Sequence, residues 1–299
     1  MLIGQLAALG TSLCFTATST FFTLGGRLVG ALIVNRTRLL IATFFLAVAH
    51  LLFRIPLPLS AEPFRYFWLA LSGIIGLALG DAFLFQAFVW IGPRLSMLMM
   101  SLAPVIAVLM SWALLGEILT SSQLFGIFLT ISGVAWVVMD RRGRQGSIPI
   151  TNRNYFLGIL FGLGAAFGQA AGLVTAKFGL VGNFPALSGT LIRMVAAALV
   201  IWMLTLLQGQ AKHTFATLSS QPRSLAYITA GAFFGPTLGV TLSLVAIQLI
   251  PVGIASTLTS LPPVLLIPVS YFVFGERIGW QAVLGTLVAI AGVAVLFLV

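Results

Sequence analysis

The chain has 299 residues, of which 60% are hydrophobic and only 7% are charged. Since a soluble domain carries roughly 25% charged residues, this composition excludes a mostly water-exposed surface and indicates a protein that crosses a membrane many times. The net charge of +10 then favours membrane orientation and contact with anionic lipid over nucleic-acid binding.

Ten stretches are long and apolar enough to cross a membrane, which takes about 20 residues as a helix. The first half predicts helices at 2–24, 31–53, 66–89, 93–115 and 121–140, and the second half predicts them at 155–178, 185–207, 224–247, 251–274 and 280–299. The first stretch lacks a basic leader and a small-x-small cleavage site, so we expect a retained helix rather than a signal peptide.

The two halves repeat one another. The stretch 92–138 superimposes without a gap on 251–297, as the 159-residue separation of Pro104 from Pro263 shows. At the same separation fall the pairs Gly76/Gly235, Gly80/Gly239, Glu117/Glu276, Gly126/Gly285 and Gly133/Gly292, whereas Arg38/Arg193 are 155 residues apart and Gly10/Gly164 are 154 apart. We therefore predict a duplication, with one repeat at 1–140, a linker at 141–154 and a second repeat at 155–299.

Each repeat holds five predicted helices, and an odd number makes the second repeat enter the membrane from the opposite side. The expected fold class is an all-α integral membrane protein with ten transmembrane helices arranged as two inverted repeats. This arrangement is typical of secondary transporters, whose substrate site lies near the membrane midplane between the repeats.

The paired Pro-to-Glu spacings and the paired glycines and arginines make the chain similar to ten-helix EamA-type members of the drug/metabolite transporter superfamily. The resemblance covers essentially the whole chain and implies an exporter or exchanger of small metabolites, with amino acids as the first candidates. Some relatives carry sugar phosphates, nucleotide sugars or lipid-linked sugars. A non-transporting membrane scaffold is the alternative from another class.

Glu117 and Glu276 follow a glycine in a short polar turn before an apolar run. A carboxylate there accepts from the free N–H groups of the next helix, so both are predicted to be helix-turn caps. Pro104, Pro262 and Pro263 lie inside predicted helices, where proline removes a backbone hydrogen bond. A packing kink and a hinge for alternating access are equally good interpretations of these prolines.

Charged side chains inside predicted helices are costly, at roughly 2.5–3.5 kcal/mol each, so they are the first candidates for a function. Asp81 lies deepest, and its partner is one of Arg38, Arg193 and Lys177. A structural ion pair and a substrate or proton site are equally good interpretations of Asp81. Snorkelling towards the headgroups is the simpler interpretation of Lys177, because it ends a helix. The matched pair Arg38 and Arg193 also suits a scaffold role shared by both repeats.

Other polar side chains and flexible methionines are predicted to line a central cavity between the first, third, fourth, sixth, eighth and ninth of the ten predicted helices. These candidates are Gln86, Gln169, Met97, Met100, Thr257 and Ser260. A glycine-rich phosphate loop, Cys/His metal spacing and a nucleophile elbow are missing from the sequence, so no enzyme activity, cofactor or metal site is predicted. The expected partners are a small-molecule substrate, membrane lipid and protons as an optional coupling ion.

The predicted location is the inner (plasma) membrane of a prokaryote. Nine Lys and Arg residues fall in the odd-numbered connections and three in the even-numbered ones. This bias places the central linker in the cytoplasm. The family resemblance implies the reverse, with both termini in the cytoplasm, and we follow the resemblance.

Overall fold

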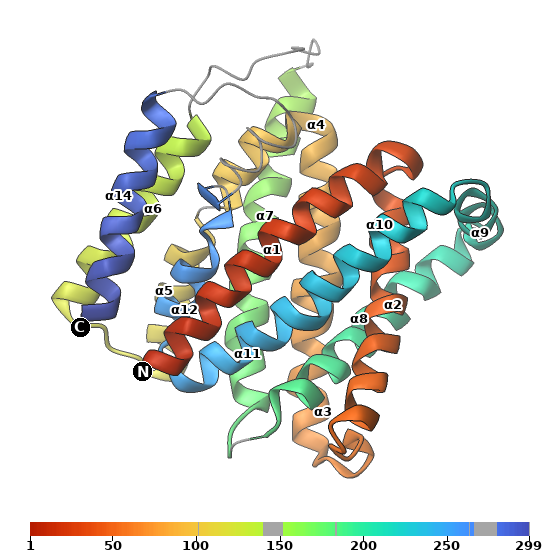
Figure 1. Ribbon diagram of the computed structural model, residues 1–299, viewed down its shortest axis with the longest axis horizontal. Coiled ribbons are helices and arrows are strands. Elements are labelled where there is room, and N and C mark those ends of the chain that lie inside the picture. Colours follow the sequence, from red (N-terminus) through yellow and green to blue (C-terminus); the bar gives the residue numbers. More distant parts are fainter. Residues whose placement is uncertain (101, 140–151, 183, 263, 266–279, 299) are drawn as a thin grey trace.

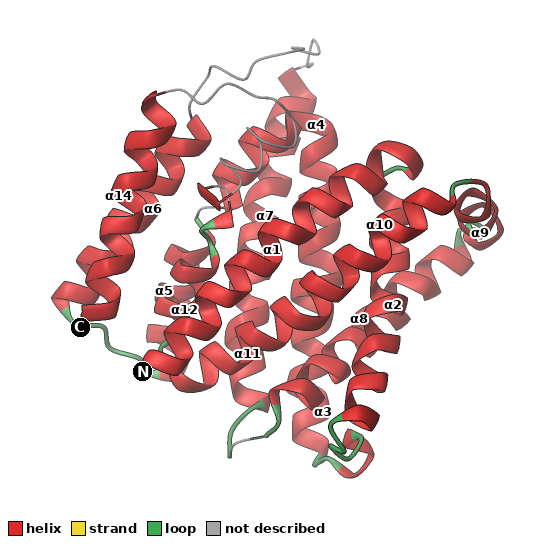
Figure 2. Cartoon of the chain, viewed as in Figure 1, coloured by secondary structure: helices red, strands yellow, loops and turns green. Residues whose placement is uncertain are grey.

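The protein is described by a computed structural model that covers residues 1–100, 102–139, 152–182, 184–262, 264–265 and 280–298. Over these ranges the regular secondary structure is entirely helical (Figures 1 and 2). The helices of the first half are α1 (Leu2–Val29), α2 (Ala31–Leu52), α3 (Pro63–Ser72), α4 (Asp81–Met100), α5 (Ala103–Leu115) and α6 (Ser121–Met139). A short 3-10 turn, η1 (Pro58–Ser60), precedes α3, and a π-helical segment, η2 (Gly73–Gly80), joins α3 to α4.

The second half contains the helices α7 (Asn152–Gly179), α8 (Ala186–Leu207), α9 (Ala211–Ser220), α10 (Pro222–Ala232), α11 (Val240–Leu249), α12 (Val252–Thr259) and α14 (Trp280–Leu298). A second π-helical segment, η4 (Phe233–Gly239), joins α10 to α11. It lies at the position that the 159-residue repeat assigns to η2. The π-helical geometry is therefore a property of both repeats.

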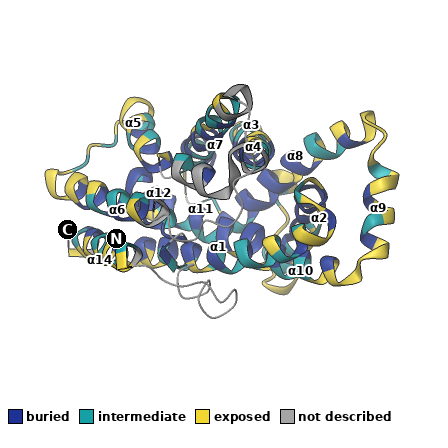
Figure 3. Ribbon diagram, turned by 90° about the horizontal axis from the view of Figure 1, so that it is seen from above, coloured by how far each residue is buried: buried dark blue, intermediate teal, exposed yellow. Residues whose placement is uncertain are grey.

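Six helical stretches of the described residues are long and apolar enough to cross a membrane, and three shorter apolar helices accompany them. The all-helical prediction is confirmed for the described residues. The count of ten remains a prediction, because much of the ninth expected span lies outside them. Large apolar side chains such as Leu109, Trp112, Phe128 and Leu199 are exposed. Figure 3 shows buried residues mainly where helices face one another. An apolar exterior of this kind suits contact with lipid.

Two glycines with positive φ end helices in the first repeat. Gly30 (φ 83°) separates α1 from α2, and Gly116 (φ 65°) takes the left-handed conformation that ends α5. Glycine adopts such angles without the steric cost that a Cβ brings, so these positions permit sharp reversals between long helices.

Several expected helix ends were wrong. The helical assignment runs from α3 to the end of α4 at Met100, past the predicted end at residue 89, and the fourth expected span (93–115) is divided between α4 and α5. Pro104 therefore lies in the first turn of α5 rather than inside a helix. Proline is tolerated there because the first N–H groups of a helix have no intrahelical acceptor. The connection 208–223, predicted as a loop, contains α9.

The equivalent helices α6 and α14 run antiparallel. A Cβ at Gly292 would lie 2.8 Å from the carbonyl oxygen of Gly126, and a Cβ at Gly133 would lie 2.6 Å from that of Gly285. The early part of α6 thus meets the late part of α14, and the late part of α6 meets the early part of α14. Glycine lets two backbones approach this closely in lipid.

A second repeat-related contact joins the first helix of each repeat to the π-helical segment of the other. A Cβ at Gly168 of α7 would lie 2.8 Å from the Cα of Gly80 in η2. The corresponding contact is that of Gly239 in η4, whose added Cβ would lie 3.2 Å from the Cβ of Cys14 in α1. Since both pairs of contacts are related by the sequence repeat, the two halves pack against one another through equivalent surfaces, with the equivalent helices α6 and α14 antiparallel.

Candidate functional site

The buried charges meet where η2 gives way to α4. Asp81, the first residue of α4, forms an ion pair through Oδ2 with Nη2 of Arg38 in α2. Its other oxygen, Oδ1, accepts a hydrogen bond of 2.9 Å from Nε2 of Gln169 in α7. Asp81 and Arg38 are 6% and 8% exposed. Of the three cations that the sequence offered Asp81, the structure pairs it with Arg38.

Arg38 is held from several sides. Its Nε donates to Oδ1 of Asn35 at 2.9 Å, one turn earlier in α2. The rings of Phe22 and Phe85 lie with their centroids 5.8 Å and 5.7 Å from its guanidinium carbon. Aromatic rings stabilise a desolvated cation, so the Arg38 guanidinium is stabilised both by its anionic partner and by the two neighbouring aromatic rings.

Arg193 in α8 has no such set of partners. It is 3% exposed, and among the described residues its Nε and Nη1 have no hydrogen-bond acceptor. The backbone of α8 at Arg193 packs directly on η2, since a Cβ at Gly73 would lie 2.8 Å from the Arg193 Cα. Its side chain passes Gly76, where an added Cβ would lie 3.6 Å from Nη2. The glycines of η2 make room for this arginine.

Lys177 and Glu117 form a second ion pair at the end of α7. Nζ of Lys177 binds Oε1 of Glu117, and Oε2 of Glu117 accepts a 2.8 Å hydrogen bond from the backbone N–H of Val252. The prediction that Glu117 caps its own following helix was therefore wrong, because its carboxylate caps α12 in the other repeat. Thr120 and Gln123 cap α6 instead, each side-chain oxygen accepting from the other residue's N–H. Lys177 is ion-paired rather than free to snorkel.

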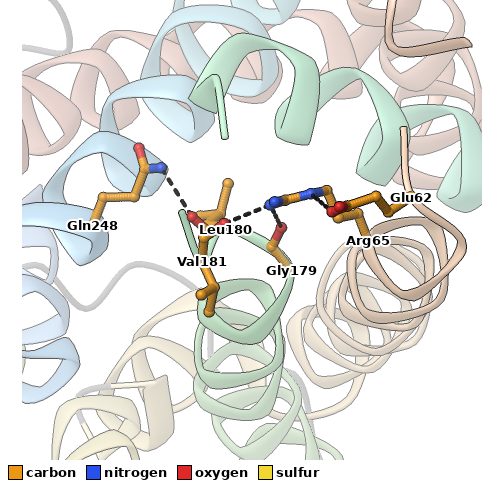
Figure 4. Close-up of polar contacts among 6 residues, drawn as sticks. All are labelled: Glu62, Arg65, Gly179, Leu180, Val181 and Gln248. Carbon is orange, nitrogen blue, oxygen red and sulfur yellow. Dashed lines mark hydrogen bonds and ion pairs between the residues drawn. The ribbon is translucent and has the colours of Figure 1, made fainter. Parts of the chain in front are cut away.

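The residues at and just after the end of α7 are also held by the side chains of Arg65 and Gln248 (Figure 4). Nη1 of Arg65 in α3 donates to the carbonyl oxygens of Gly179 at 3.2 Å and Val181 at 2.5 Å, and its Nε contacts Glu62 at 2.8 Å. From the opposite side, Nε2 of Gln248 in α11 donates to the carbonyl oxygen of Leu180 at 3.5 Å, as Figure 4 shows, and to that of Phe184 at 2.8 Å. Arg65 was counted only as a loop charge, and the sequence contains no signal for this role, because Arg65 lies in the first turn of α3 and the helix end that it caps is 114 residues away.

The remaining candidates have local partners or fall outside the description. Thr257 is fully buried, and its hydroxyl donates to the Gly253 carbonyl oxygen at 2.8 Å, while the Ser260 hydroxyl donates to Thr257 at 2.8 Å. Gln86 and Met100 are half-buried. Pro262 follows the interruption after α12 and is buried. Pro263, Glu276 and the side chain of Met97 lie outside the described residues.

A groove of about 340 Å³ lies elsewhere, between α5 and α6. Its lining is almost wholly apolar, with Val105, Val108 and Ile131 among its residues, and Leu124 and Phe128 on its wall are exposed. Such a surface suits lipid better than polar cargo. The described residues also contain no group of three His, Cys, Asp or Glu side chains that would hold a metal ion.

A chain whose described residues are all helical in their regular structure, with an apolar exterior and two repeated halves, is a multi-pass integral membrane protein. Residues 2–139 and 156–298 match the EamA-like transporter family, and the chain belongs to this family within the drug/metabolite transporter superfamily. Membership makes it a membrane transporter of small molecules rather than an enzyme.

The fold is shared with a protein of known crystal structure, which is 18% identical in sequence and superimposes with a TM-score of 0.76 over 99% of this chain and 96% of that one. At this identity the likeness shows the fold alone. No curated protein matches the sequence.

Proposed function

We propose that the protein is a secondary transporter that exports or exchanges small metabolites, with amino acids as the first candidates, by alternating access between its two repeats. The buried contact of Asp81 with Arg38 and Gln169 carries this proposal. In this proposal the charge lies inside the membrane, where Asp81 of the first repeat contacts Gln169 of the second. Charged groups in that position mark substrate or ion pathways in transporters.

The contacts at the end of α7 support a state that is closed at one end. Glu117 and Arg65 belong to the first repeat, whereas their partners Lys177, Val252 and Gly179 belong to the second. Opening a pathway at this end requires the repeats to separate there, and so requires these contacts to break. Polar contacts with partly exposed side chains are weak enough to break and reform in each cycle.

The cargo class and the energy source form part of the proposal. Anionic sugar phosphates, nucleotide sugars or lipid-linked sugars are the second candidate cargo, favoured by the surplus of buried arginine. Coupling to protons through Asp81 requires Arg38 to release the carboxylate during the cycle, and facilitated exchange requires no such step. We place the protein in a prokaryotic plasma membrane with both termini in the cytoplasm, which a reporter fused to the C-terminus tests.

The decisive experiment is counterflow uptake in proteoliposomes with a panel of labelled amino acids and sugar phosphates. We expect saturable uptake of at least one compound, exceeding that of protein-free vesicles. Asp81→Asn keeps an acceptor for Gln169 but removes the charge that Arg38 binds, so a loss of uptake in this variant gives Asp81 a role in the cycle. Arg223→Gln, at an exposed residue of α10, is the matched control. A panel without any uptake above empty vesicles contradicts the proposed function and favours a scaffold.

A further inference from the structure

The arginine in α8 is the buried charge that the contacts described so far leave unexplained. Arg193 is 3% exposed, and among the described residues neither Nε nor Nη1 has an acceptor. Buried polar groups nearly always have a partner, and an unpaired buried charge is costlier still. A buried guanidinium with N–H groups that lack acceptors, in a membrane protein, indicates a partner that binds and dissociates.

The nearest acid is already occupied. Asp81 gives one oxygen to Arg38 and the other to Gln169. Two arginines and one aspartate leave one positive charge of this cluster uncompensated. Nη2 of Arg193 lies beside Gly76, where an added Cβ would be 3.6 Å away, so the side chain runs along η2 towards its Asp81 end; both oxygens of Asp81 bond to Arg38 and Gln169 instead.

The sequence repeat shows what is missing. Arg193 is the counterpart of Arg38, and the counterpart of Asp81, 159 residues later, is Val240. Val240 is 7% exposed and packs in one apolar cluster with Leu191 and Met194, which flank Arg193 along α8. In the first repeat the arginine has an acid at this position, whereas in the second repeat it has an apolar side chain.

We propose that Arg193 binds an oxyanion group, a carboxylate or a phosphate, of the transported molecule, which takes the role that Asp81 has beside Arg38. The inference rests on the proposed transport function and narrows its cargo to molecules that carry such a group. Amino acids, carboxylic acids and phosphorylated metabolites meet this condition, whereas uncharged and purely cationic molecules do not. Guanidinium groups are well suited to both anions because they present several N–H donors in one plane.

The first test is thermal unfolding of the full-length protein in detergent with matched ligand pairs at constant ionic strength. The probes are benzoate against benzamide, succinate against succinamide, phenyl phosphate against phenol, and inorganic phosphate alone. We expect at least one organic acid to raise the Tm by about 5 °C near saturation, with its neutral analogue inactive. If no acid stabilises the protein more than its neutral analogue, the inference is wrong.

The variants separate a ligand site from a structural arginine. Val240→Asp supplies the missing acid, so it is expected to pair with Arg193 and abolish the acid-specific rise in Tm. Val240→Asn introduces a side chain of the same shape as aspartate but without its charge, so this variant is expected to keep the acid-specific rise in Tm. Arg193→Gln is expected to lose it, and the Val240 pair keeps the test decisive if Arg193→Gln does not fold. An acid-specific rise that persists in Val240→Asp, or that Val240→Asn also removes, contradicts the inference.

In a competition assay, unlabelled compounds are added during counterflow uptake of a labelled one. This assay separates the anion site at Arg193 from the proposed transport function, and a bound cargo from a free anion. If a transported acid is displaced equally well by its amide, the cargo's anionic group is not recognised and the inference fails while transport stands. If acids stabilise the protein through Arg193 but none is transported, the proposed function fails while the anion site stands. If inorganic phosphate stabilises the protein and none of the organic acids does, Arg193 binds free anions and not the cargo, and the inference is wrong.

Discussion

Glu117 and Lys177 join the two repeats at one end of the molecule, because the carboxylate of Glu117 binds the Lys177 ammonium with one oxygen and the N–H of Val252 with the other. Glu117 lies in the turn after α5. Of its two partners in the other repeat, Val252 begins α12 and Lys177 lies near the end of α7. This single side chain therefore connects three segments that must move apart if the end opens.

Removing the lysine should loosen that end. Lys177→Met deletes an ion pair whose side chains are 26% and 14% exposed, which is worth about 1 kcal/mol. We expect labelling of Leu180→Cys, a buried position three residues further on, to become roughly fivefold faster in a Cys14→Ala background. Arg223→Met removes a cation from exposed α10 and is the control. Equal acceleration by both substitutions would assign the effect to net charge and not to this contact.

Arg65 should order the segment after α7. It donates to the carbonyl oxygen of Gly179, the last residue of α7, and to that of Val181, two residues beyond; the last carbonyl groups of a helix have no intrahelical donor. Arg65→Met is expected to increase hydrogen exchange of the backbone amides of Leu180, Val181 and Gly182 and to leave exchange in α10 unchanged. Arg54→Met, in the turn after α2, is the matched control. Unchanged protection of these three amides would show that Gln248 alone is enough to hold the segment.

The pair of Asp81 and Arg38 should be strongly coupled in stability. Removing one partner leaves a buried charge behind, so Asp81→Leu is expected to lower the free energy of unfolding by about 3–5 kcal/mol. The double variant Asp81→Leu/Arg38→Met removes both charges and is expected to be less destabilised than Asp81→Leu. Denaturant unfolding in detergent measures this cycle. Additive losses would mean that the pair makes no net interaction.

Gly73 should tolerate no side chain. An added Cβ would meet the Arg193 Cα at 2.8 Å, so Gly73→Ala must push η2 away from α8, at about 1–3 kcal/mol. Gly26 in α1 is the control, because its added Cβ would have only Val34 nearby, at 3.8 Å. Gly26→Ala is expected to stabilise the helix by about 0.5–1 kcal/mol. Opposite shifts in Tm support the close approach, and similar shifts would exclude it.

The repeat predicted much of the fold because backbone contacts between small residues follow from sequence spacing. The 159-residue separation pairs Gly126 and Gly133 with their counterparts, and these glycines meet across α6 and α14. The predicted break between residues 89 and 93 was wrong, since α4 continues to Met100 and α5 begins at Ala103, because apolar composition does not fix where one helix ends and the next begins. Proline was assigned to a helix interior, although the chain uses Pro104 in a first turn.

The site was predicted less completely, since choosing partners needs three dimensions. Asp81, Arg38, Gln169 and Arg193 were all candidates, but spacing alone did not decide which cation the acid binds. Glu117 was assigned to the nearest helix start, whereas the folded chain brings the start of α12 to it. Val240 gave no signal of its own, and it became informative only when its counterpart Asp81 was found in an ion pair.

The reciprocal contact between α6 and α14 has the geometry of an isologous dimer interface contained in one chain. The same patch of each helix, Gly126 with Gly133 or Gly285 with Gly292, serves both partners. In a symmetric dimer such a patch must be complementary to itself, so each substitution is felt twice. Fusion into one chain removes that constraint and lets the halves diverge, as they have at Asp81 and Val240.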